Sequence, residues 1–222
     1  METKTLNLGD QFPNFQAETT QGNIDFYEWM GESWAVLLSH PADYTPVCTT
    51  ELARVAALLP EFEKRNVKPI ALSCDTVDSH KGWIEDIKCY GKLSSFDYPI
   101  IADNERKLAL KLNMLDKDEI NAEGIPLTCR AVFIVDETKK LRSQILYPAT
   151  TGRNFNEILR VIDSMQLTGR ESLATPADWN QGDTCMILPT LSNEEASKKY
   201  PKGFKTFNVP SGKTYIRQTP QP

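Results

Sequence analysis

A proline, a threonine and a cysteine stand at fixed spacing in the stretch HPADYTPVCTTEL, residues 40–52. The apolar run WAVLLS precedes it and a long amphipathic segment follows, so the stretch is predicted to link a strand to a helix. Thr45 then occupies the N-cap and Pro46 the first helical position, which proline tolerates well. Cys48 becomes the third helical residue, where a capping box would place a carboxylate.

This position favours a reactive Cys48. The first helical turn presents unpaired N–H groups and about half a positive charge, which stabilise a thiolate, the nucleophilic form of cysteine. A less basic thiolate is also a weaker nucleophile, so the site must stabilise the leaving group as well. The Thr45 hydroxyl can bond both the sulfur and a bound oxygen, while Pro41 and Pro46 stiffen the loop. A buried, inert cysteine is the alternative, but the N-cap and prolines argue against it.

The elements that position this loop form an α/β pattern. Residues 1–33 predict an N-terminal hairpin, and residues 34–39 and 67–75 predict two strands of a right-handed βαβ unit, with Pro60 kinking the helix between them. Further along, the pattern predicts helices at 79–90, 105–112 and 154–167, a strand at 99–103, and an antiparallel pair at 129–136 and 140–148. One parallel and one antiparallel half resemble a thioredoxin-like fold.

The pattern of long helices and apolar strands ends after Gly169. Residues 169–222 predict a small α+β appendage with too few apolar residues for a core of its own, so we expect it to lie against another surface. The predicted domains are therefore residues 1–168 and residues 169–222.

The motif P-x-x-x-T-x-x-C, here Pro41, Thr45 and Cys48, resembles the peroxidatic signature of the peroxiredoxins. The wider stretches SWAVLLSHPADYTPVCTTEL, ILYPATTGRNFNEILRVID and YIRQTPQP resemble the 1-Cys subfamily, of the peroxiredoxin-6 type. The resemblance implies a thioredoxin-like peroxidase domain without a cofactor, and a homodimer that exchanges its C-terminal arms.

Four further residues are candidates for the site. Arg130 opens an apolar strand, which fits a paired structural charge or an anion site; the resemblance makes it the arginine that contacts sulfur and peroxide. Glu51, one turn after Cys48, is either a solvated surface residue or a residue that orients an arginine. Arg153 corresponds to a second arginine near the pocket, or it caps a helix. His40 is expected to line the pocket, with a structural histidine as the alternative.

The implied reaction is attack of the Cys48 thiolate on one peroxide oxygen, giving a sulfenic acid and water or an alcohol. Arg130, the Thr45 hydroxyl and the N–H groups of residues 47–48 would stabilise the leaving oxygen. No Val-Cys-Pro triplet marks a resolving cysteine, and Cys185 is the nearest candidate by position. Cys74, Cys89, Cys129 and Cys185 are all expected to be buried. We therefore expect an external thiol, of the glutathione or thioredoxin type, as reductant.

Composition and short motifs argue against several other binding partners and sites. The 222-residue chain has a net charge of −5 and no Lys/Arg block, which argues against nucleic acid and anionic membranes as partners. Five cysteines without C-x-x-C predict reduced thiols, and the polar N-terminus lacks a signal sequence, so we expect a cytoplasmic protein without membrane insertion. Two histidines without a metal-ligand spacing argue against a metal site. The SGKT segment lacks the upstream glycine of a phosphate loop.

Two other activities are alternatives to peroxide reduction. Some relatives of this subfamily carry a phospholipase serine in G-x-S-x-G; here GESWA keeps Ser33, lacks the last glycine, and has Tyr27 and Thr138 where the partnering His and Asp would stand. A serine without a base is a poor nucleophile, so this activity is not expected. A non-enzymatic holdase chaperone is the other alternative, and its action should survive Cys48→Ser.

Overall fold

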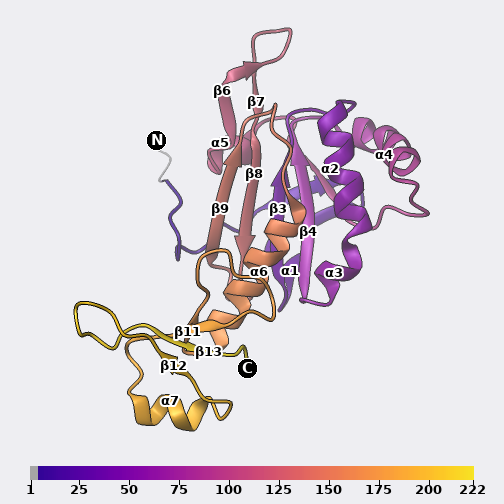
Figure 1. Cartoon of the computed structure of the whole chain (residues 1–222). Coiled ribbons are helices and arrows are strands. Elements are labelled where there is room, and N and C mark those ends of the chain that lie inside the picture. Colours follow the sequence, from indigo (N-terminus) through magenta and orange to yellow (C-terminus); the bar gives the residue numbers. More distant parts are fainter. Residues whose placement is uncertain (1–4) are drawn as a thin grey trace. The chain divides into compact units, whose positions relative to one another are not determined.

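The computed structural model describes residues 5–222, and the chain divides into two compact units, Met1–Phe155 and Asn156–Pro222 (Figure 1). Each unit is described separately. The division falls at the start of the helix that follows β9, whereas the predicted boundary lies at residue 168, near the end of that helix.

The first unit is built on a seven-stranded mixed sheet with the order β2-β1-β5-β4-β3-β8-β9. Its central strand, β3 (Trp34–Ser39), runs parallel to β4 (Val67–Ser73) and antiparallel to β8 (Arg130–Val135). The predicted combination of a parallel and an antiparallel half is thus confirmed. The remaining strands are β1 (Gln16–Thr19), β2 (Gly22–Asp25), β5 (Ile100–Ala102) and β9 (Leu141–Tyr147).

The predicted N-terminal hairpin is confirmed as β1 and β2. Gly22 has a φ of 103°, a conformation that glycine adopts without steric cost, and it closes the tight turn between the two strands. A short helix that the sequence pattern did not predict, α1 (Phe26–Met30), follows directly. Its N-cap, Asp25, accepts from the backbone N–H groups of Tyr27 and Glu28.

The helix after β3 differs from the prediction. Instead of one helix kinked at Pro60, there are two: α2 (Pro46–Ala57) and α3 (Leu59–Glu63), with Pro60 in the first turn of α3. Proline has no N–H to donate to the preceding turn, so it is better placed at a helix start than in a helix interior. The helix α2 packs against α4 (Val77–Gly91).

The β5–β8 connection holds the short helix α5 (Lys107–Lys111) and a two-stranded hairpin, β6 (Leu115–Ile120) and β7 (Pro126–Thr128). The hairpin was not predicted, because β6 has the sequence LDKDEI, whose acidic and basic residues give no clear alternation.

The core of the first unit surrounds β3, whose residues 35–39 are all buried. Phe12, Phe26 and Phe133 meet in it, with ring centroids 5.5 and 5.8 Å from the ring of Phe12. This packing fixes β8 against the N-terminal segment, and β8 carries Arg130 at its start.

The second unit holds a four-stranded sheet of order β10-β11-β13-β12 and its own small apolar cluster. The cluster was not expected, because the apolar residues of the segment are few; Trp179, Cys185, Ile187 and Tyr200 are nevertheless buried in it. Helix α7 starts with a capping box between Ser192 and Glu195. The elements are α6 (Phe155–Arg170), β10 (Leu173–Ala174), β11 (Cys185–Ile187), α7 (Asn193–Lys199), β12 (Lys205–Thr206) and β13 (Arg217–Thr219).

Among residues 5–222, no helix combines the length and the apolar character needed to cross a membrane.

Candidate active site

Cys48 lies at the start of α2, as predicted. Thr45 has the extended N-cap conformation (φ −112°, ψ 146°), Pro46 opens the helix, and Cys48 is the third helical residue. The Thr45 side chain does not cap the helix, however: its hydroxyl donates to the carbonyl oxygen of Ala42, at 2.9 Å. The hydroxyl oxygen therefore keeps its lone pairs, with which it can accept a hydrogen bond from a ligand.

The sulfur of Cys48 is fully buried and faces Arg130, the first residue of β8. One nitrogen of the guanidinium group, Nη1, donates to Sγ at 3.3 Å. Nε and Nη2 both donate to the carbonyl oxygen of Ala149, at 2.8 and 2.6 Å. The guanidinium is thus fixed on one side by a backbone carbonyl while its other side points at the sulfur.

Glu51 joins Arg130 to Arg153. Its Oε2 accepts from Arg130 Nη1 at 2.9 Å and from Arg153 Nη2 at 2.6 Å, while Oε1 accepts from Arg153 N at 2.7 Å and Nε at 3.1 Å. All three side chains are buried, so the interpretation of Glu51 as a solvated surface residue is wrong. Burial raises the pKa of Glu51, but Arg153 and then Arg130 outweigh it and hold that pKa below its usual value.

The charges of this cluster leave room for one more anion. Two guanidinium groups, Arg130 and Arg153, share a single carboxylate, Glu51. The surplus positive charge lies on the side of Arg130 that contacts Cys48. A thiolate at Cys48 would balance it, and a buried site strengthens this attraction relative to water.

His40 and Pro41 are buried in the loop that joins β3 to α2. His40 belongs to a second polar cluster. His40 Nε2 lies 3.0 Å from Asp43 Oδ1, and His80 Nδ1 lies 2.7 Å from Asp43 Oδ2. Burial raises the pKa of Asp43, but the hydrogen bonds from both imidazoles outweigh it and hold that pKa below its usual value. Burial lowers the pKa of His40. The cluster anchors the loop, through Asp43, to helix α4.

Sequence reasoning missed Asp43 and His80. One ligand atom from each of His40, Asp43 and His80 lies within 4.8 Å of the others, which is close enough for a metal site that the spacing argument did not foresee. Hydrogen bonds account for the arrangement, since His80 Nε2 also lies 3.2 Å from the carbonyl oxygen of Ile101. A carboxylate inside the motif loop, three residues after a histidine, was the available signal.

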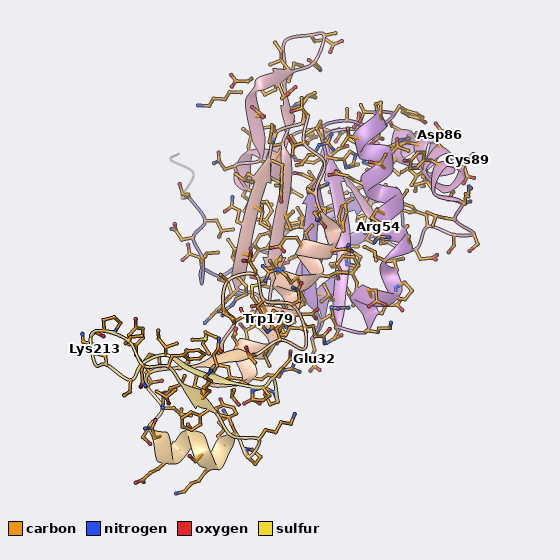
Figure 2. The ribbon with its side chains drawn as sticks, in the orientation of Figure 1. Glu32, Arg54, Asp86, Cys89, Trp179 and Lys213 are labelled. Carbon is orange, nitrogen blue, oxygen red and sulfur yellow. The ribbon has the colours of Figure 1, made fainter. Side chains whose placement is uncertain are left out.

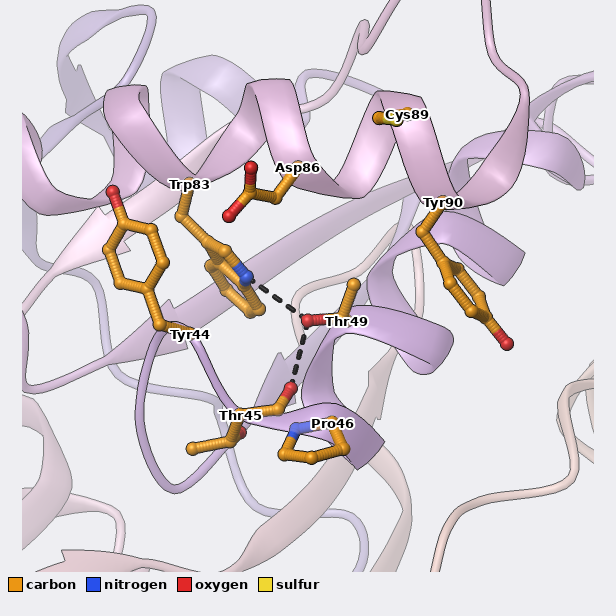
Figure 3. Close-up of a pocket in the computed structure, with 8 residues that line it drawn as sticks. All are labelled: Tyr44, Thr45, Pro46, Thr49, Trp83, Asp86, Cys89 and Tyr90. Carbon is orange, nitrogen blue, oxygen red and sulfur yellow. Dashed lines mark hydrogen bonds between the residues drawn. The ribbon is translucent and has the colours of Figure 1, made fainter.

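A pocket of about 440 Å³ lies on the other side of the α2 N-terminus, between α2 and α4 (Figure 3). Trp83 Nε1 donates to the Thr49 hydroxyl at 3.1 Å, and that hydroxyl donates to the Thr45 carbonyl oxygen at 2.8 Å. Cys48, His40 and Pro41 are not among its lining residues. The pocket is lined by Tyr44, Thr45, Pro46, Thr49, Trp83, Asp86, Cys89 and Tyr90.

Cys89 is exposed on α4, close to Asp86, so its predicted burial is wrong (Figure 2). All five cysteines are free. Burial raises the pKa of Cys74 to about 11, and it also raises the pKa of Cys129 and of Cys185. These three thiols are therefore poor nucleophiles at neutral pH.

Ser33, the candidate esterase nucleophile, donates to the side-chain oxygen of Asn66 at 2.8 Å. Tyr27 instead donates its hydroxyl to the carbonyl oxygen of Phe12. Within residues 5–222, no histidine or carboxylate is hydrogen-bonded to Ser33.

Comparison with known proteins extends these observations over the whole chain. Residues 8–144 match the AhpC/TSA family, and residues 164–203 match the C-terminal domain of 1-Cys peroxiredoxin. Peroxiredoxin-6 of Gallus gallus is 58% identical, with 98% of each chain covered. The 1-Cys peroxiredoxin of Onchocerca volvulus is 55% identical, with 96% of this chain and 97% of that protein covered.

Solved structures agree. A mutant of peroxiredoxin 6 of Arenicola marina superposes with a TM-score of 0.95 at 58% identity, covering 98% of this chain and 99% of the other. A yeast mitochondrial 1-Cys peroxiredoxin, solved to address thiol resolving via the glutathione/thioredoxin systems, gives 0.88 at 45% identity, covering 97% and 100%. With a buried thiol aimed at an arginine and full-length similarity to thiol peroxidases, the chain belongs to the peroxiredoxins, in their 1-Cys, peroxiredoxin-6 type subfamily.

Proposed function

We propose that Cys48 is the peroxidatic residue, and that its thiolate attacks one oxygen of hydrogen peroxide or of an organic hydroperoxide. The observation that carries this assignment is the 3.3 Å contact between Sγ and Arg130 Nη1, made by a guanidinium that Ala149 and Glu51 already hold in place. A donor fixed before the reaction costs no reorganisation when negative charge develops.

In this step a sulfur–oxygen bond forms and the oxygen–oxygen bond breaks. The leaving oxygen takes the bonding electron pair and a proton and departs as water or an alcohol, and Cys48 becomes a sulfenic acid. Arg130 and the N–H groups of residues 47–48 stabilise the leaving oxygen. The Thr45 hydroxyl, which donates to the Ala42 carbonyl oxygen, accepts a hydrogen bond from the O–H of the bound peroxide.

Glu51 and Arg153 act as positioning residues, since their hydrogen bonds run to Arg130, to each other and to the backbone rather than to the sulfur. Pro41 and His40 form buried walls of the substrate pocket. Asp43 holds His40 in this role through the 3.0 Å hydrogen bond.

The sulfenic acid is reduced by an external thiol, of the glutathione or thioredoxin type. Two observations support this: burial disfavours the thiolates of Cys74, Cys129 and Cys185, and a similar yeast protein has been studied for resolution by these two systems. Peroxide consumption with each reductant in turn tests the choice. Loss of turnover in Cys185→Ser, with oxidation of Cys48 intact, would contradict an external reductant.

The protein works in the cytoplasm as a homodimer, in which the segment 169–222 packs on the partner subunit and residues 1–168 form the peroxidase domain. The match of residues 164–203 to the C-terminal domain of 1-Cys peroxiredoxins supports a distinct role for this arm. Light scattering of the full chain measures the mass directly, and a monomer at micromolar concentration would contradict the dimer.

Cys48→Ser tests the central assignment, with Cys89→Ser as the matched control because Cys89 is exposed and lies outside the arginine cluster. We expect Cys48→Ser to abolish peroxide reduction and Cys89→Ser to retain it. Peroxide consumption near the wild-type rate in Cys48→Ser would refute the assignment.

A further inference from the structure

The two histidines of the chain share one buried carboxylate. His40 and His80 are fully buried, and their ring centroids lie 6.2 Å apart. Asp43 bridges them, with Oδ1 3.0 Å from His40 Nε2 and Oδ2 2.7 Å from His80 Nδ1. Positive charge on both rings would be strongly repulsive here, because little water screens charges in a protein interior. The hydrogen-bond partners of each ring therefore decide which of them is charged.

Asp43 is an ionised carboxylate. The Ser79 hydroxyl donates to its Oδ2 at 2.7 Å, so every side chain that contacts this carboxyl group is able to donate. An ionised carboxylate accepts hydrogen bonds and has no hydrogen to give. His40 Nε2 and His80 Nδ1 must therefore each carry a hydrogen.

His80 meets an acceptor at both of its nitrogens. Nδ1 faces Asp43, and Nε2 lies 3.2 Å from the carbonyl oxygen of Ile101 in β5. A carbonyl oxygen only accepts, so Nε2 needs a hydrogen of its own. A neutral imidazole has one N–H, and these contacts use two, which only an imidazolium supplies. An imidazolium also has no lone pair to give to a metal ion.

His40 differs at its second nitrogen. Nδ1 is buried and has no hydrogen-bond partner among residues 5–222. If His40 were charged, Nδ1–H would be a buried charged donor without an acceptor, which costs more than an unused lone pair on a neutral ring. Burial lowers the pKa of His40, in agreement with this assignment. The contacts thus favour a neutral His40 with its hydrogen on Nε2.

The other charged group that acts on His40 is Asp75, two residues after the end of β4. Its Oδ2 accepts from the backbone N–H of Asp43 at 3.0 Å and from the Ser73 hydroxyl at 2.7 Å. Within the described residues it forms no ion pair with either imidazole. The Trp83 ring, 5.2 Å from the His40 ring, is uncharged. Asp75 adds negative charge next to the cluster, which favours one cation within it.

We propose that His80 is a positioning residue of the peroxidase: it carries the positive charge that balances Asp43, and it thereby keeps His40 neutral. The inference rests on the proposed function, in which His40 lines the substrate pocket. With His40 neutral, the charged donor at the Cys48 sulfur is Arg130. Without His80, the carboxylate of Asp43 would face a single imidazole and would favour a proton on His40.

The test is nitrogen-15 NMR of the reduced full-length protein with labelled histidine. The chain has two histidines, so all imidazole signals come from this cluster. The nitrogen-15 shift and the one-bond coupling to hydrogen distinguish a nitrogen that carries hydrogen from one with a free lone pair. At neutral pH we expect hydrogen on both nitrogens of His80 and on Nε2 of His40, and a free lone pair on Nδ1 of His40.

Two reciprocal variants test the coupling between the rings. In His80→Gln, we expect the midpoint of His40 protonation to move to higher pH than in wild type. His40→Gln is the matched control, because it leaves both acceptors of His80 in place; His80 should keep both hydrogens at neutral pH. Amide spectra show whether each variant keeps the fold, and the wild-type spectrum tests the charge assignment without any substitution.

Three results would overturn the proposal: a free lone pair on His80 in wild type at neutral pH, hydrogen on both nitrogens of His40 under the same conditions, or a His40 midpoint that does not rise in folded His80→Gln. The spectra are recorded without peroxide. A failure of the wild-type protein to consume peroxide would therefore contradict the proposed function and leave the charge assignment of His80 standing.

Discussion

Arg130→Lys separates the charge of Arg130 from its hydrogen-bonding geometry. The guanidinium contacts the Cys48 sulfur at 3.3 Å, Glu51 at 2.9 Å and the Ala149 carbonyl oxygen through two nitrogens. A lysine ammonium carries the same charge on one nitrogen, so it cannot span these three groups together.

The expected loss follows from the number of donors removed. Deleting one preorganised donor to a developing oxyanion lowers the rate by about 100- to 1,000-fold, or about 3 to 4 kcal/mol. Because lysine keeps the charge, we expect the lower end of this range, about 100-fold in the second-order rate constant for hydrogen peroxide. Stability should fall as well, since Glu51 loses one of its partners.

The assay is rapid mixing of the reduced protein with hydrogen peroxide, followed by quantifying the sulfenic acid on Cys48 by trapping and mass spectrometry. Arg142→Lys is the matched control, because Arg142 lies on the neighbouring strand β9 and its side chain is 44% exposed. A rate constant for Arg130→Lys within about twofold of wild type would refute the argument that geometry, and not charge alone, activates the site.

Three further predictions concern the surroundings of the site. Glu51→Gln should lower the free energy of unfolding by about 3 kcal/mol, because it leaves two buried guanidinium groups without a carboxylate. Chemical denaturation measures this loss, with Glu32→Gln as the control because Glu32 is exposed. The pKa of Asp43 is lowered in the folded protein, so its contribution to stability is complete above about pH 5 and is lost as the pH falls through about 4 and below. Asp43→Asn should therefore flatten the acid limb of the stability profile, and an unchanged limb would contradict the role of this cluster. A bulky disulfide reagent should modify Cys89 fastest in the native protein, because Cys89 is exposed while Cys48 is fully buried, and Cys89→Ser should remove that fast phase.

Local sequence rules were enough to place Cys48 at the start of a helix. The N-cap position of Thr45, proline in the first turn and Cys48 at the third helical residue depend only on neighbours in the chain, and the structure has all three. The alternation of strands and helices likewise predicted the mixed sheet.

Contacts between side chains that are distant in the sequence could not be predicted from local rules. The salt-bridge cluster joins Glu51 to residues 79 and 102 positions further along, and Asp43 meets His80 across 37 positions. The position of Arg130 at the start of an apolar strand left a structural charge and an anion site both open. The resemblance to the peroxiredoxins decided between them and also indicated Arg153, whereas nothing indicated His80. The sequence predicted the N-cap position of Thr45 but not the partner of its hydroxyl, because that partner, the Ala42 carbonyl oxygen, depends on the path of the loop.

The complete burial of the Cys48 sulfur sets a size limit on what can react with it in the folded protein. A molecule as small as hydrogen peroxide needs little space, whereas a peptide or protein thiol cannot approach until the first turn of α2 opens. That turn is tied down by the Thr49 amide and hydroxyl, which both donate to the Thr45 carbonyl oxygen, and by Trp83. If the proposed external thiol recycles this sulfur, the two halves of the cycle need different states of the same helical turn. It is closed while the thiolate attacks peroxide and open while the reducing thiol attacks the sulfenic acid.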